Sequence, residues 1–340
     1  MQRIITVTFH CAHNYGAVLQ AYALQKYIEN NYEDYYTACL DYRPPYLKNH
    51  LIVRNKNEGV IKAIFHNVIA FNSRYKRKRV FDRFICTHIR TIDGEDLDNV
   101  DTVFVVGSDQ VWNKNITGNN IDPVYTLDFV SKARKASYAA SVGTLDEALH
   151  EVVASKIRGF DKIGVREFES KLLLEKYGIH NVKVNVDPVF LLNKDDYAAL
   201  AETVRDDDYI LIYTLETNFE ITKIIPQYRD KYKIVSIGSF RNIYGTDCHL
   251  SSLSPQKYLG IIQGAKHVIT NSFHAVAFSI IFEKSFEYIP LKNGRGVRIE
   301  NLLSLIKYNE NSNNPCAWKE LLANEINESK KWIEEIIKGR

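Results

Sequence analysis

The sequence predicts an α/β protein made of two doubly wound domains. Short apolar, β-branched segments bounded by Gly, Asp or Pro alternate with helix-like segments along almost the whole chain, as expected for parallel strands that are buried on both faces. The alternation restarts after an acidic, helical stretch at 194–208, which indicates a second sheet. At 340 residues, the chain has room for about two domains, each with its own core.

The first domain is predicted to span residues 1–195. Its first strand is 3–8 (RIITVT), and a helix follows over about 16–30, where apolar side chains recur near helical spacing. Further strands are expected at 36–40, 102–106, 137–142, 162–165 and 182–186. The block 185–192 (NVDPVFLL) closes the pattern of this domain.

The second domain is predicted to span residues 196–317, with strands at 209–215, 233–237, 267–270 and 286–289. A last helix, at about 318–338 within the segment 318–340, is expected to pack back across the domain junction. Ligands of doubly wound sheets bind beyond the carboxyl ends of the strands. We therefore expect the functional site in the cleft that the two domains face.

Composition excludes several classes of protein. The chain has 44 Lys or Arg and 41 Asp or Glu, a formal net charge of +3, which is too even for a histone-like protein. The five cysteines form no C-x-x-C pair and their odd number fits no disulfide framework, which indicates a reducing compartment. The first residues resemble a strand rather than a signal peptide. We therefore expect a cytoplasmic protein.

One dense basic run stands out, Arg74–Arg79 (RYKRKR). The simplest interpretation is a solvated face of the helix that includes Val80 and Phe84. The alternatives are a polyanionic substrate and an anionic membrane surface, which would hold the protein at the inner face of the membrane. We expect no nucleic acid partner, because no stacking aromatics at a recognisable spacing accompany the run.

The familiar phosphate and hydrolase motifs are missing. The sequence contains no G-x-x-x-x-G-K-[ST], no G-x-G-x-x-G after the first strand and no G-x-S-x-G. His10 and His13 have an H-x-x-H spacing, but no distant Cys/His pair offers the remaining ligands of a metal. We expect neither a metal nor a cofactor.

The loop after the first strand is a candidate ligand site. His13, Asn14, Tyr15 and Gly16 lead directly into a helix. Asn14 can cap this helix, and Gly16 lets another group approach the backbone closely. Exposed N–H groups at a helix start can bind an anion or a hydroxyl group. A plain helix cap is the alternative.

A second candidate follows the strand 102–106, where the sequence Gly107–Asn113 reads GSDQVWN. So many polar and aromatic side chains at a strand end are more than a turn requires. Asp109 could act as a general base and Trp112 as a sugar-stacking face. The alternative is a capped turn with a packed Trp.

Four further residues carry charge suited to an anionic substrate. Arg166 follows the strand 162–165, where its rigid fork suits a carboxylate, although an ion pair with Glu167 or Glu169 is possible. His274 falls in the first turn of a helix, where it could donate a proton when an anion is bound; a packed or capping histidine is the alternative. Arg295 and Arg298 lie on a glycine-flexed loop that could bind an anion or simply be surface.

Taken together, six blocks in order resemble the polysaccharide pyruvyl transferase family. They are 14–25 (NYGAVLQAYALQ), 107–113 (GSDQVWN), 165–167 (VRE), 187–192 (DPVFLL), 271–286 (NSFHAVAFSIIFEKSF) and 298–303 (RIENLL). The resemblance implies a GT-B-like fold of two Rossmann-like domains. It also implies phosphoenolpyruvate as co-substrate and a sugar as acceptor, free or in a lipid-linked oligosaccharide. The product would be a cyclic ketal in a capsule or exopolysaccharide of the bacterial cell surface.

The resemblance gives the candidate residues their roles. His274 and Asp109 would be catalytic. The first domain would take the acceptor through His13, Asn14, Tyr15, Gly16, Ser108, Gln110 and Trp112, and the second domain would take the donor. Ser272 stands where many family members carry an arginine, so the donor cations would be Arg166 together with Lys284, Arg295 or Arg298. The alternatives are a nucleotide-sugar glycosyltransferase of the same shape and a catalytically silent glycan-binding homologue.

Overall fold

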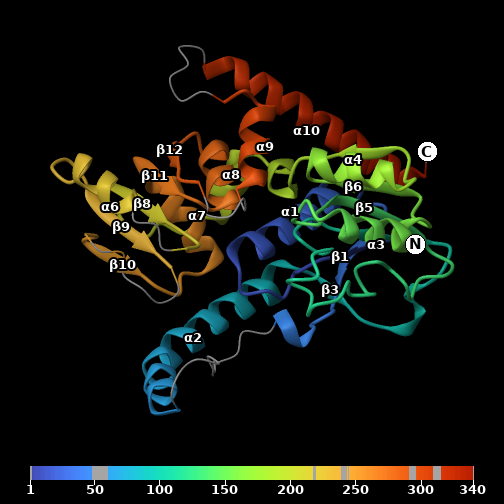
Figure 1. The fold of residues 1–340 in the computed structure, drawn as a ribbon, viewed down its shortest axis with the longest axis horizontal. Helices are drawn as coiled ribbons and strands as arrows, with labels where there is room; N and C mark the ends of the chain where they lie inside the picture. Colours follow the sequence, from blue (N-terminus) through green and yellow to red (C-terminus); the bar gives the residue numbers. More distant parts are fainter. Residues whose placement is uncertain are drawn as a thin grey trace.

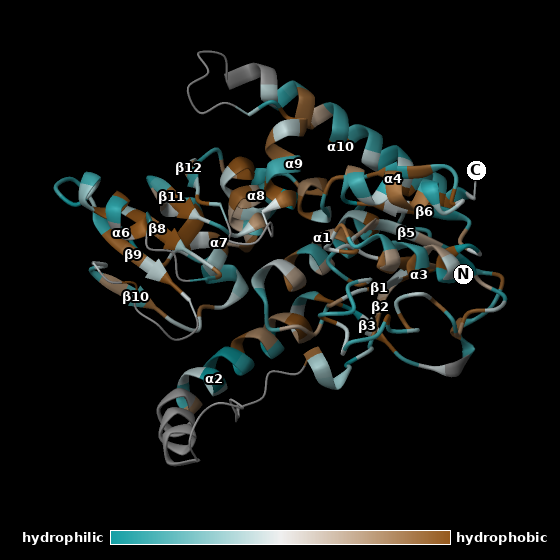
Figure 2. Cartoon of the chain, viewed as in Figure 1, coloured by the Kyte–Doolittle hydropathy of each residue, from teal (hydrophilic) through white to brown (hydrophobic). Residues whose placement is uncertain are grey.

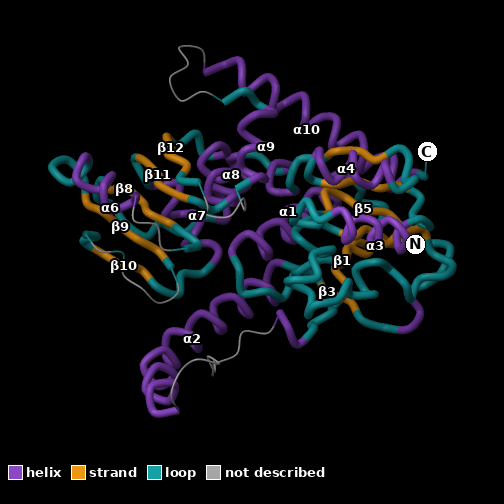
Figure 3. Tube along the Cα trace, in the orientation of Figure 1, coloured by secondary structure: helices purple, strands orange, loops and turns teal. Residues whose placement is uncertain are grey.

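A computed structural model describes residues 2–47, 60–216, 220–238, 243, 245–290, 296–308 and 315–339. It contains two separate parallel sheets, each flanked by helices (Figures 1 and 3). Apolar residues concentrate on the strands and on the helix faces that cover them (Figure 2). None of the helices in the described part of the chain is long and apolar enough to cross a membrane.

The first sheet has the strand order β3-β2-β1-β4-β5-β6-β7. Its strands are β1 (Arg3–Val7), β2 (Tyr36–Leu40), β3 (Thr91–Ile92), β4 (Thr102–Val106), β5 (Arg134–Ala140), β6 (Lys162–Val165) and β7 (Val182–Val184). Strands β1 and β4 pair in parallel at the centre, where the strand order reverses. The helices of this half are α1 (Tyr15–Asn31), α2 (Val60–His88), α3 (Glu147–Ile157) and α4 (Phe168–Lys176).

The second sheet has the order β10-β9-β8-β11-β12. Its strands are β8 (Tyr209–Tyr213), β9 (Lys233–Ile237), β10 (Cys248–Leu250), β11 (His267–Thr270) and β12 (Ser285–Tyr288). The helices that follow the first domain are α5 (Lys194–Leu200), α6 (Glu220–Ile224), α7 (Pro255–Gly264), α8 (Phe273–Ile281), α9 (Val297–Leu305) and α10 (Pro315–Lys338).

The helix predicted at 194–208 is wrong in its length, because α5 ends at Leu200. A contact between this segment and helix α7 ends the helix early. The chain leaves the helix in an extended conformation at Ala201 and runs along α7, where the backbone N–H of Glu202 donates to the carbonyl of Gln256. Gly260 makes this approach possible, since a Cβ there would lie 1.9 Å from the carbonyl oxygen of Glu202.

Helices α1 and α7 join the two domains. The ring of Tyr15 on α1 stacks on that of Tyr258 on α7, with centroids 4.2 Å apart and planes 3° apart. The Tyr15 hydroxyl also donates to the carbonyl of Leu253 at 3.0 Å. These contacts fix the base of the cleft, because they hold the start of the first helix of one domain on the other domain.

Helix α10 returns from the second half of the chain to the first domain (Figure 1). Arg134 on β5 donates to the carbonyls of Ile336 and Ile337 at 2.8 and 2.7 Å. The backbone N–H of Val186 donates to the hydroxyl of Ser329 at 3.0 Å. The last helix therefore lies across both halves of the molecule.

Candidate functional site

A cavity of about 710 Å³ opens between the two domains. From the first domain it is lined by loops that follow β4 and β5 and by the start of α4, including Gln110, Asn113, Gly143, Glu167 and Ser170. From the second domain it is lined by the loop after β8 and the start of α9, including Leu215, Glu216 and Arg298. These segments all lie at carboxyl ends of parallel strands or at helix starts, where doubly wound proteins bind ligands.

A buried ion pair lies at the centre of the first domain's side of the site. Arg166 follows β6 and donates from Nη1 to Oδ2 of Asp187 at 2.7 Å, and both side chains are almost fully buried. The hydroxyl of Ser108 donates to the same Oδ2 at 3.1 Å. Asp187 also accepts the backbone N–H of Val189 through its other oxygen, at 3.1 Å, so its carboxylate is held from several sides.

One edge of the Arg166 guanidinium stays without a partner. Nε and Nη2 are buried and donate to no acceptor among the described residues. The nearest carboxylate oxygen to Nε, on Glu167, lies 3.6 Å away. Phe273 of the second domain places its ring 5.1 Å from the guanidinium carbon, which holds the plane of the cation. A buried guanidinium edge of this kind matches the two oxygens of a carboxylate.

His274 reaches this ion pair from the second domain. It lies in the first turn of α8, 8% exposed, with Nε2 at 3.6 Å from Oδ2 of Asp187. Nε2 is buried and forms no hydrogen bond with any described residue. The imidazole packs directly on Gly16 of α1, because a Cβ on Gly16 would lie 2.0 Å from its Nδ1. The glycine predicted to allow a close approach therefore makes room for this histidine.

The ionisation of the pair follows from these contacts. Burial alone would raise the pKa of the Asp187 carboxyl, but the facing His274 and Arg166 hold that pKa well below its usual range. Burial would likewise lower the pKa of the Arg166 guanidinium, but the two carboxylates next to it raise it. Both groups therefore stay charged in the folded protein.

Arg298 at the start of α9 is a cation without an ion pair. It is half-buried, and no carboxylate oxygen of the described residues lies within 4.0 Å of it. With its amide oxygen turned toward α9, Gln110 accepts from Nη2 of Arg298 at 2.8 Å. Burial and the positive charge of Arg166 lower the pKa of Arg298. An anion between the two arginines would relieve this repulsion.

Glu167 is a functional candidate that the sequence interpretation treated only as an ion-pair partner. It is 5% exposed and lines the cavity. One carboxylate oxygen accepts from the hydroxyl of Ser141 at 2.6 Å, whereas Oε2 is buried with no hydrogen-bond partner in the described chain. A buried acceptor next to a cavity is positioned to take a hydrogen bond or a proton from a ligand.

Asp109 occupies a strained position beside this cavity. Its backbone has φ 79°, a conformation uncommon for a residue other than glycine. One carboxylate oxygen accepts from the backbone N–H of Gln110 at 2.8 Å, and the Asp109 carbonyl accepts from the N–H of Ser141. These two hydrogen bonds hold the strained turn after β4 in place. The role of Asp109 as a base stays a prediction.

The prediction that Trp112 offers a sugar-stacking face is wrong. Trp112 is fully buried in the core of the first domain, and its indole N–H donates to the carbonyl of Tyr125 at 2.8 Å. The alternative, a packed Trp, applies because both faces of the ring and its one donor are satisfied inside the domain. Ser108 is also fully buried and holds Asp187, so it does not meet an acceptor.

The loop at the start of α1 is structural in three of its four predicted residues. Asn14 accepts from the N–H groups of Gly16 and Ala17, at 2.9 and 3.3 Å, and so caps the helix. Nε2 of His13 lies 3.0 Å from Asp82 on α2, and Tyr15 is buried at the domain junction. Asn14, Tyr15 and Nε2 of His13 therefore have partners within the protein, whereas Nδ1 of His13 is buried with none among the described residues.

Lys284 does not lie at the site. It precedes β12, and the neighbouring strand pairs His267 with Ser285, so Lys284 lies at the amino end of the sheet. Asn271–His274 follow the opposite, carboxyl end. Lys284 therefore cannot supply the donor cation in place of Ser272. Ser272 itself is buried at the start of α8 and makes no side-chain capping bond, and Arg295 lies outside the described residues.

The residues described in the structure include no group of three or more His, Cys, Asp and Glu side chains arranged to hold a metal ion. The site places two arginines and a histidine next to carboxylates, and the amides of Gln110 and Asn113 border it. Such a site can bind a carboxylate or phosphate and move a proton next to it.

The family model for polysaccharide pyruvyl transferases matches residues 14–290. The chain belongs to this family. The match takes in every strand of both sheets except β1, and every residue of the cluster formed by Arg166, Asp187 and His274. Members of this family are transferases that act on polysaccharides, so the family implies a sugar or polysaccharide acceptor. No curated protein sequence matches the chain at a significant level.

Several solved structures are similar to this pyruvyl transferase family member over most of its length. A protein from Listeria monocytogenes assigned as a UDP-N-acetylglucosamine 2-epimerase has a TM-score of 0.50 at 10% identity, covering 99% of this chain and 91% of that one. The UDP-GlcNAc 2-epimerase from Neisseria meningitidis bound to UDP-GlcNAc has a TM-score of 0.47 at 10% identity, covering 99% and 100%. The E. coli heptosyltransferase WaaC with ADP has a TM-score of 0.41 at 10% identity, covering 87% and 89%. At such identities the likeness concerns the fold alone. The fold is α/β and GT-B-like, with two Rossmann-like domains.

Proposed function

We propose that this protein moves the pyruvyl group of phosphoenolpyruvate onto two hydroxyls of a sugar in a surface polysaccharide or its lipid-linked precursor. The reaction would form a cyclic ketal and release phosphate. Family membership supports this proposal. The observation that carries it is that buried Arg166 keeps an unpartnered edge, while the unpartnered Nε2 of His274 faces the same Asp187 carboxylate that Arg166 binds.

Each group of the donor has a counterpart in the site. The carboxylate of phosphoenolpyruvate would accept from Nε and Nη2 of Arg166. Its phosphate would lie toward Arg298, the half-buried cation that has no carboxylate partner among the described residues. Arg295 is a further candidate by position in the sequence. The donor would then fill the space where Arg166 and Arg298 repel each other.

His274 would supply the proton that begins the reaction. Transfer of a proton from the imidazolium to the methylene carbon of the donor creates an oxocarbenium-like centre at C2. The carboxylate of Asp187, held in its charged form, stabilises the imidazolium across 3.6 Å. General acid catalysis of this kind contributes about two to four orders of magnitude in rate.

The acceptor would attack from the cavity. A sugar hydroxyl adds to C2 and loses its proton to a carboxylate, for which Glu167 has the better geometry, since its Oε2 is buried, unpartnered and at the cavity wall. Asp109 is the base predicted from the sequence. The bond from C2 to the phosphate oxygen then breaks, and phosphate leaves with the proton that the base took from the first hydroxyl. A second hydroxyl of the same sugar adds to C2 and closes the ketal, and its proton returns to the neutral imidazole of His274.

The test is phosphate release from phosphoenolpyruvate with acceptors that end in galactose, mannose or a hexosamine. Acceptor-dependent release with a mass gain on the sugar would support the proposal. Glu167→Gln should then lose about two to four orders of magnitude in rate, and Asp109→Asn should keep most of the rate. The reverse order would assign the base to Asp109.

Calorimetry distinguishes the remaining outcomes. Binding of phosphoenolpyruvate that weakens in Arg298→Gln would support the donor site. Binding of a uridine or guanosine diphosphate with no binding of phosphoenolpyruvate would favour a nucleotide-sugar glycosyltransferase. Binding of glycan with neither donor would identify a silent homologue.

A further inference from the structure

Helix α2 extends away from both sheets (Figure 1). Among its residues from 71 onward, one side packs on the body of the protein through Phe81, Phe84 and Ile85, which are at most 2% exposed. Between residues 60 and 88 the sequence has seven Lys or Arg and a single acidic residue, Asp82. The basic run at 74–79 belongs to this helix, and the structure divides its members between two sides.

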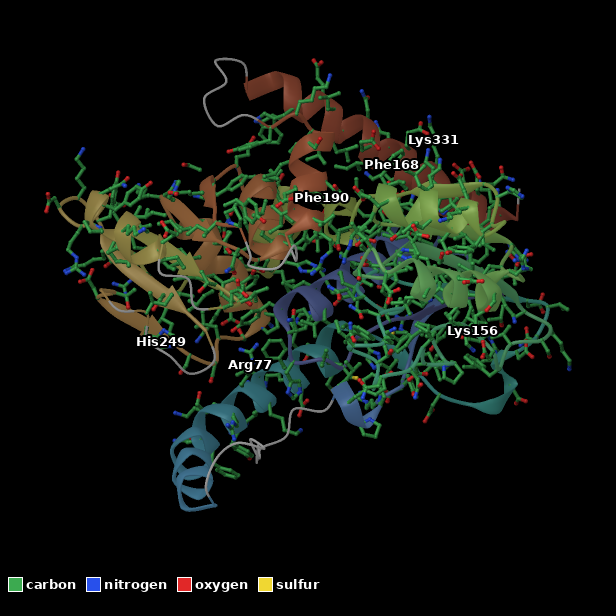
Figure 4. The ribbon with its side chains drawn as sticks, viewed as in Figure 1. Arg77, Lys156, Phe168, Phe190, His249 and Lys331 are labelled. Carbon is green, nitrogen blue, oxygen red and sulfur yellow. The ribbon has the colours of Figure 1, made fainter. Side chains whose placement is uncertain are left out.

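Arg77 belongs to the packed side. Its guanidinium carbon lies 4.9 Å from the ring centroid of Tyr15 and 4.8 Å from that of Phe81, and Nη2 donates to the carbonyl of His13 at 2.9 Å. Figure 4 places Arg77 near the domain junction. Arg77 therefore holds α2 on the start of α1, and it does not contribute to the outer surface.

The opposite side of α2 presents two aromatic rings to solvent. Phe71 and Tyr75, one helical turn apart, are 45% and 50% exposed. Their rings stack with centroids 6.3 Å apart and planes 9° apart. Exposed aromatic rings on a helix are costly in water, whereas aromatic side chains are favoured at the boundary between lipid headgroups and acyl chains.

A row of free cations runs beside these rings. Lys76, Arg79 and Arg83 are exposed, follow each other at helical spacing, and have no carboxylate partner among the described residues. The nearby Asp82 is already engaged by Lys78 and by His13. The solvent-facing side therefore combines uncompensated positive charge with apolar rings.

We infer that this side of α2, formed by Phe71, Tyr75, Lys76, Arg79 and Arg83, is a docking surface for an anionic membrane. The rings would enter the headgroup region while the cations meet lipid phosphates. The projection of α2 from the body lets this side lie against a flat surface. The inference is independent of the proposed function, because it concerns where the protein binds and not what it converts.

The test is sedimentation of the full chain with vesicles of phosphatidylcholine alone or of equal parts phosphatidylcholine and phosphatidylglycerol. We expect binding to the anionic vesicles only, weakening as salt is raised. The combined variant Lys76→Gln, Arg79→Gln and Arg83→Gln should weaken it by about two orders of magnitude, since each cation near an anionic membrane contributes about a fivefold gain in affinity. The variant Phe71→Ser with Tyr75→Ser should bind more weakly at every salt concentration.

A matched control removes three exposed cations elsewhere, by Lys132→Gln, Lys231→Gln and Lys233→Gln. The change in net charge is the same, and none of these lysines forms an ion pair with a described carboxylate. Equal loss in this control would show attraction by net charge alone and would overturn the inference. So would unchanged binding in the α2 variants. If those variants instead lower the oligomeric state in equilibrium sedimentation, the surface is a contact between copies of the chain, and the membrane inference is wrong.

Discussion

The starts of helices α1 and α8 have similar sequences but different roles in the structure. Each follows a parallel strand through a short polar loop with an Asn and a His, at 13–16 in the first domain and at 271–274 in the second. At α1, Asn14 caps the helix and His13 pairs with Asp82. At α8, Ser272 makes no capping bond and Nε2 of His274 lacks a hydrogen-bond partner among the described residues.

The difference shows how a polar helix start becomes a site. Polar groups that find partners within the protein stabilise the fold, and this holds for Asn14, for the Tyr15 hydroxyl and for Nε2 of His13. Polar groups that are buried without a partner cost free energy, which a ligand that pairs with them would recover. In this molecule the two starts also meet, since Gly16 of α1 forms the floor beneath the His274 imidazole.

The largest expected effect tests the α8 start. His274→Ala should lower the rate of acceptor-dependent phosphate release by about two to four orders of magnitude, because it removes the proton donor. The control is His180→Ala, which changes an exposed histidine outside the cleft and should keep the rate. Full activity of His274→Ala would mean that α8 starts with a packing histidine, as α1 does.

Asp187 is the carboxylate that His274 faces at the start of α8. Asp187→Asn should lower the free energy of unfolding by about 3–5 kcal/mol at neutral pH, because buried Arg166 loses its closest counter-ion. The folded pKa of Asp187 lies below its ordinary value of about 3.9. Its contribution is therefore present above that ordinary pKa and is lost as the pH falls through the depressed one. In urea unfolding, the difference in free energy of unfolding between wild type and variant should become smaller as the pH is lowered. A difference that stays constant with pH would mean that Asp187 is not the titrating group.

Much of the fold was predictable from the sequence, because buried parallel strands are continuous apolar runs. The strands at 36–40, 102–106, 162–165, 233–237 and 267–270 have the predicted bounds. β3 and β10 were not predicted, since they are two- and three-residue edge strands with too few residues to show a pattern.

The site was predictable only in part. Arg166 and His274 were found because each follows a strand at the expected cleft. Asp187 was missed as a site residue, since an Asp before Pro188 is also an ordinary cap, and it does cap that turn. Trp112 was misassigned because a sequence does not show whether an indole packs inward or faces a ligand. Lys284 was misassigned because proximity to His274 along the chain is not proximity across a sheet.

Tyr15 tests the structural role of the α1 start. Tyr15→Ala should lower the free energy of unfolding by about 3–5 kcal/mol, because it removes a buried ring from the stack on Tyr258. Tyr15→Phe keeps the ring and loses the two hydrogen bonds of the hydroxyl, to the carbonyl of Leu253 and from Nη1 of Arg77, so it should cost about 1–2 kcal/mol. A Tyr15→Ala variant that is inactive yet as stable as wild type in urea would place this residue in the site instead.

Gly16 tests the place where the two starts touch. Gly16→Ala would put a Cβ 2.0 Å from Nδ1 of His274, so the imidazole must move. A displacement of about 1 Å near reacting groups costs about a hundredfold in rate, and we expect a loss of that order in phosphate release. Gly159→Ala is the matched control, because a Cβ there has no atom within 4 Å. Equal activity of Gly16→Ala and wild type would show that the position of His274 does not matter to the reaction.

The smallest effect separates the two caps. Asn14→Ala removes the acceptor for the N–H groups of Gly16 and Ala17 and should lower the free energy of unfolding by about 1 kcal/mol, while Asn14→Ser should restore most of it. Ser272→Ala removes no capping bond, so by the same urea measurement it should cost less than Asn14→Ala. If Ser272 contacts the donor, calorimetry will show weaker binding of phosphoenolpyruvate in Ser272→Ala but not in Asn14→Ala. If the two variants have the same stability and the same affinity for phosphoenolpyruvate, the start of α1 and the start of α8 do not differ in role, and the comparison is wrong.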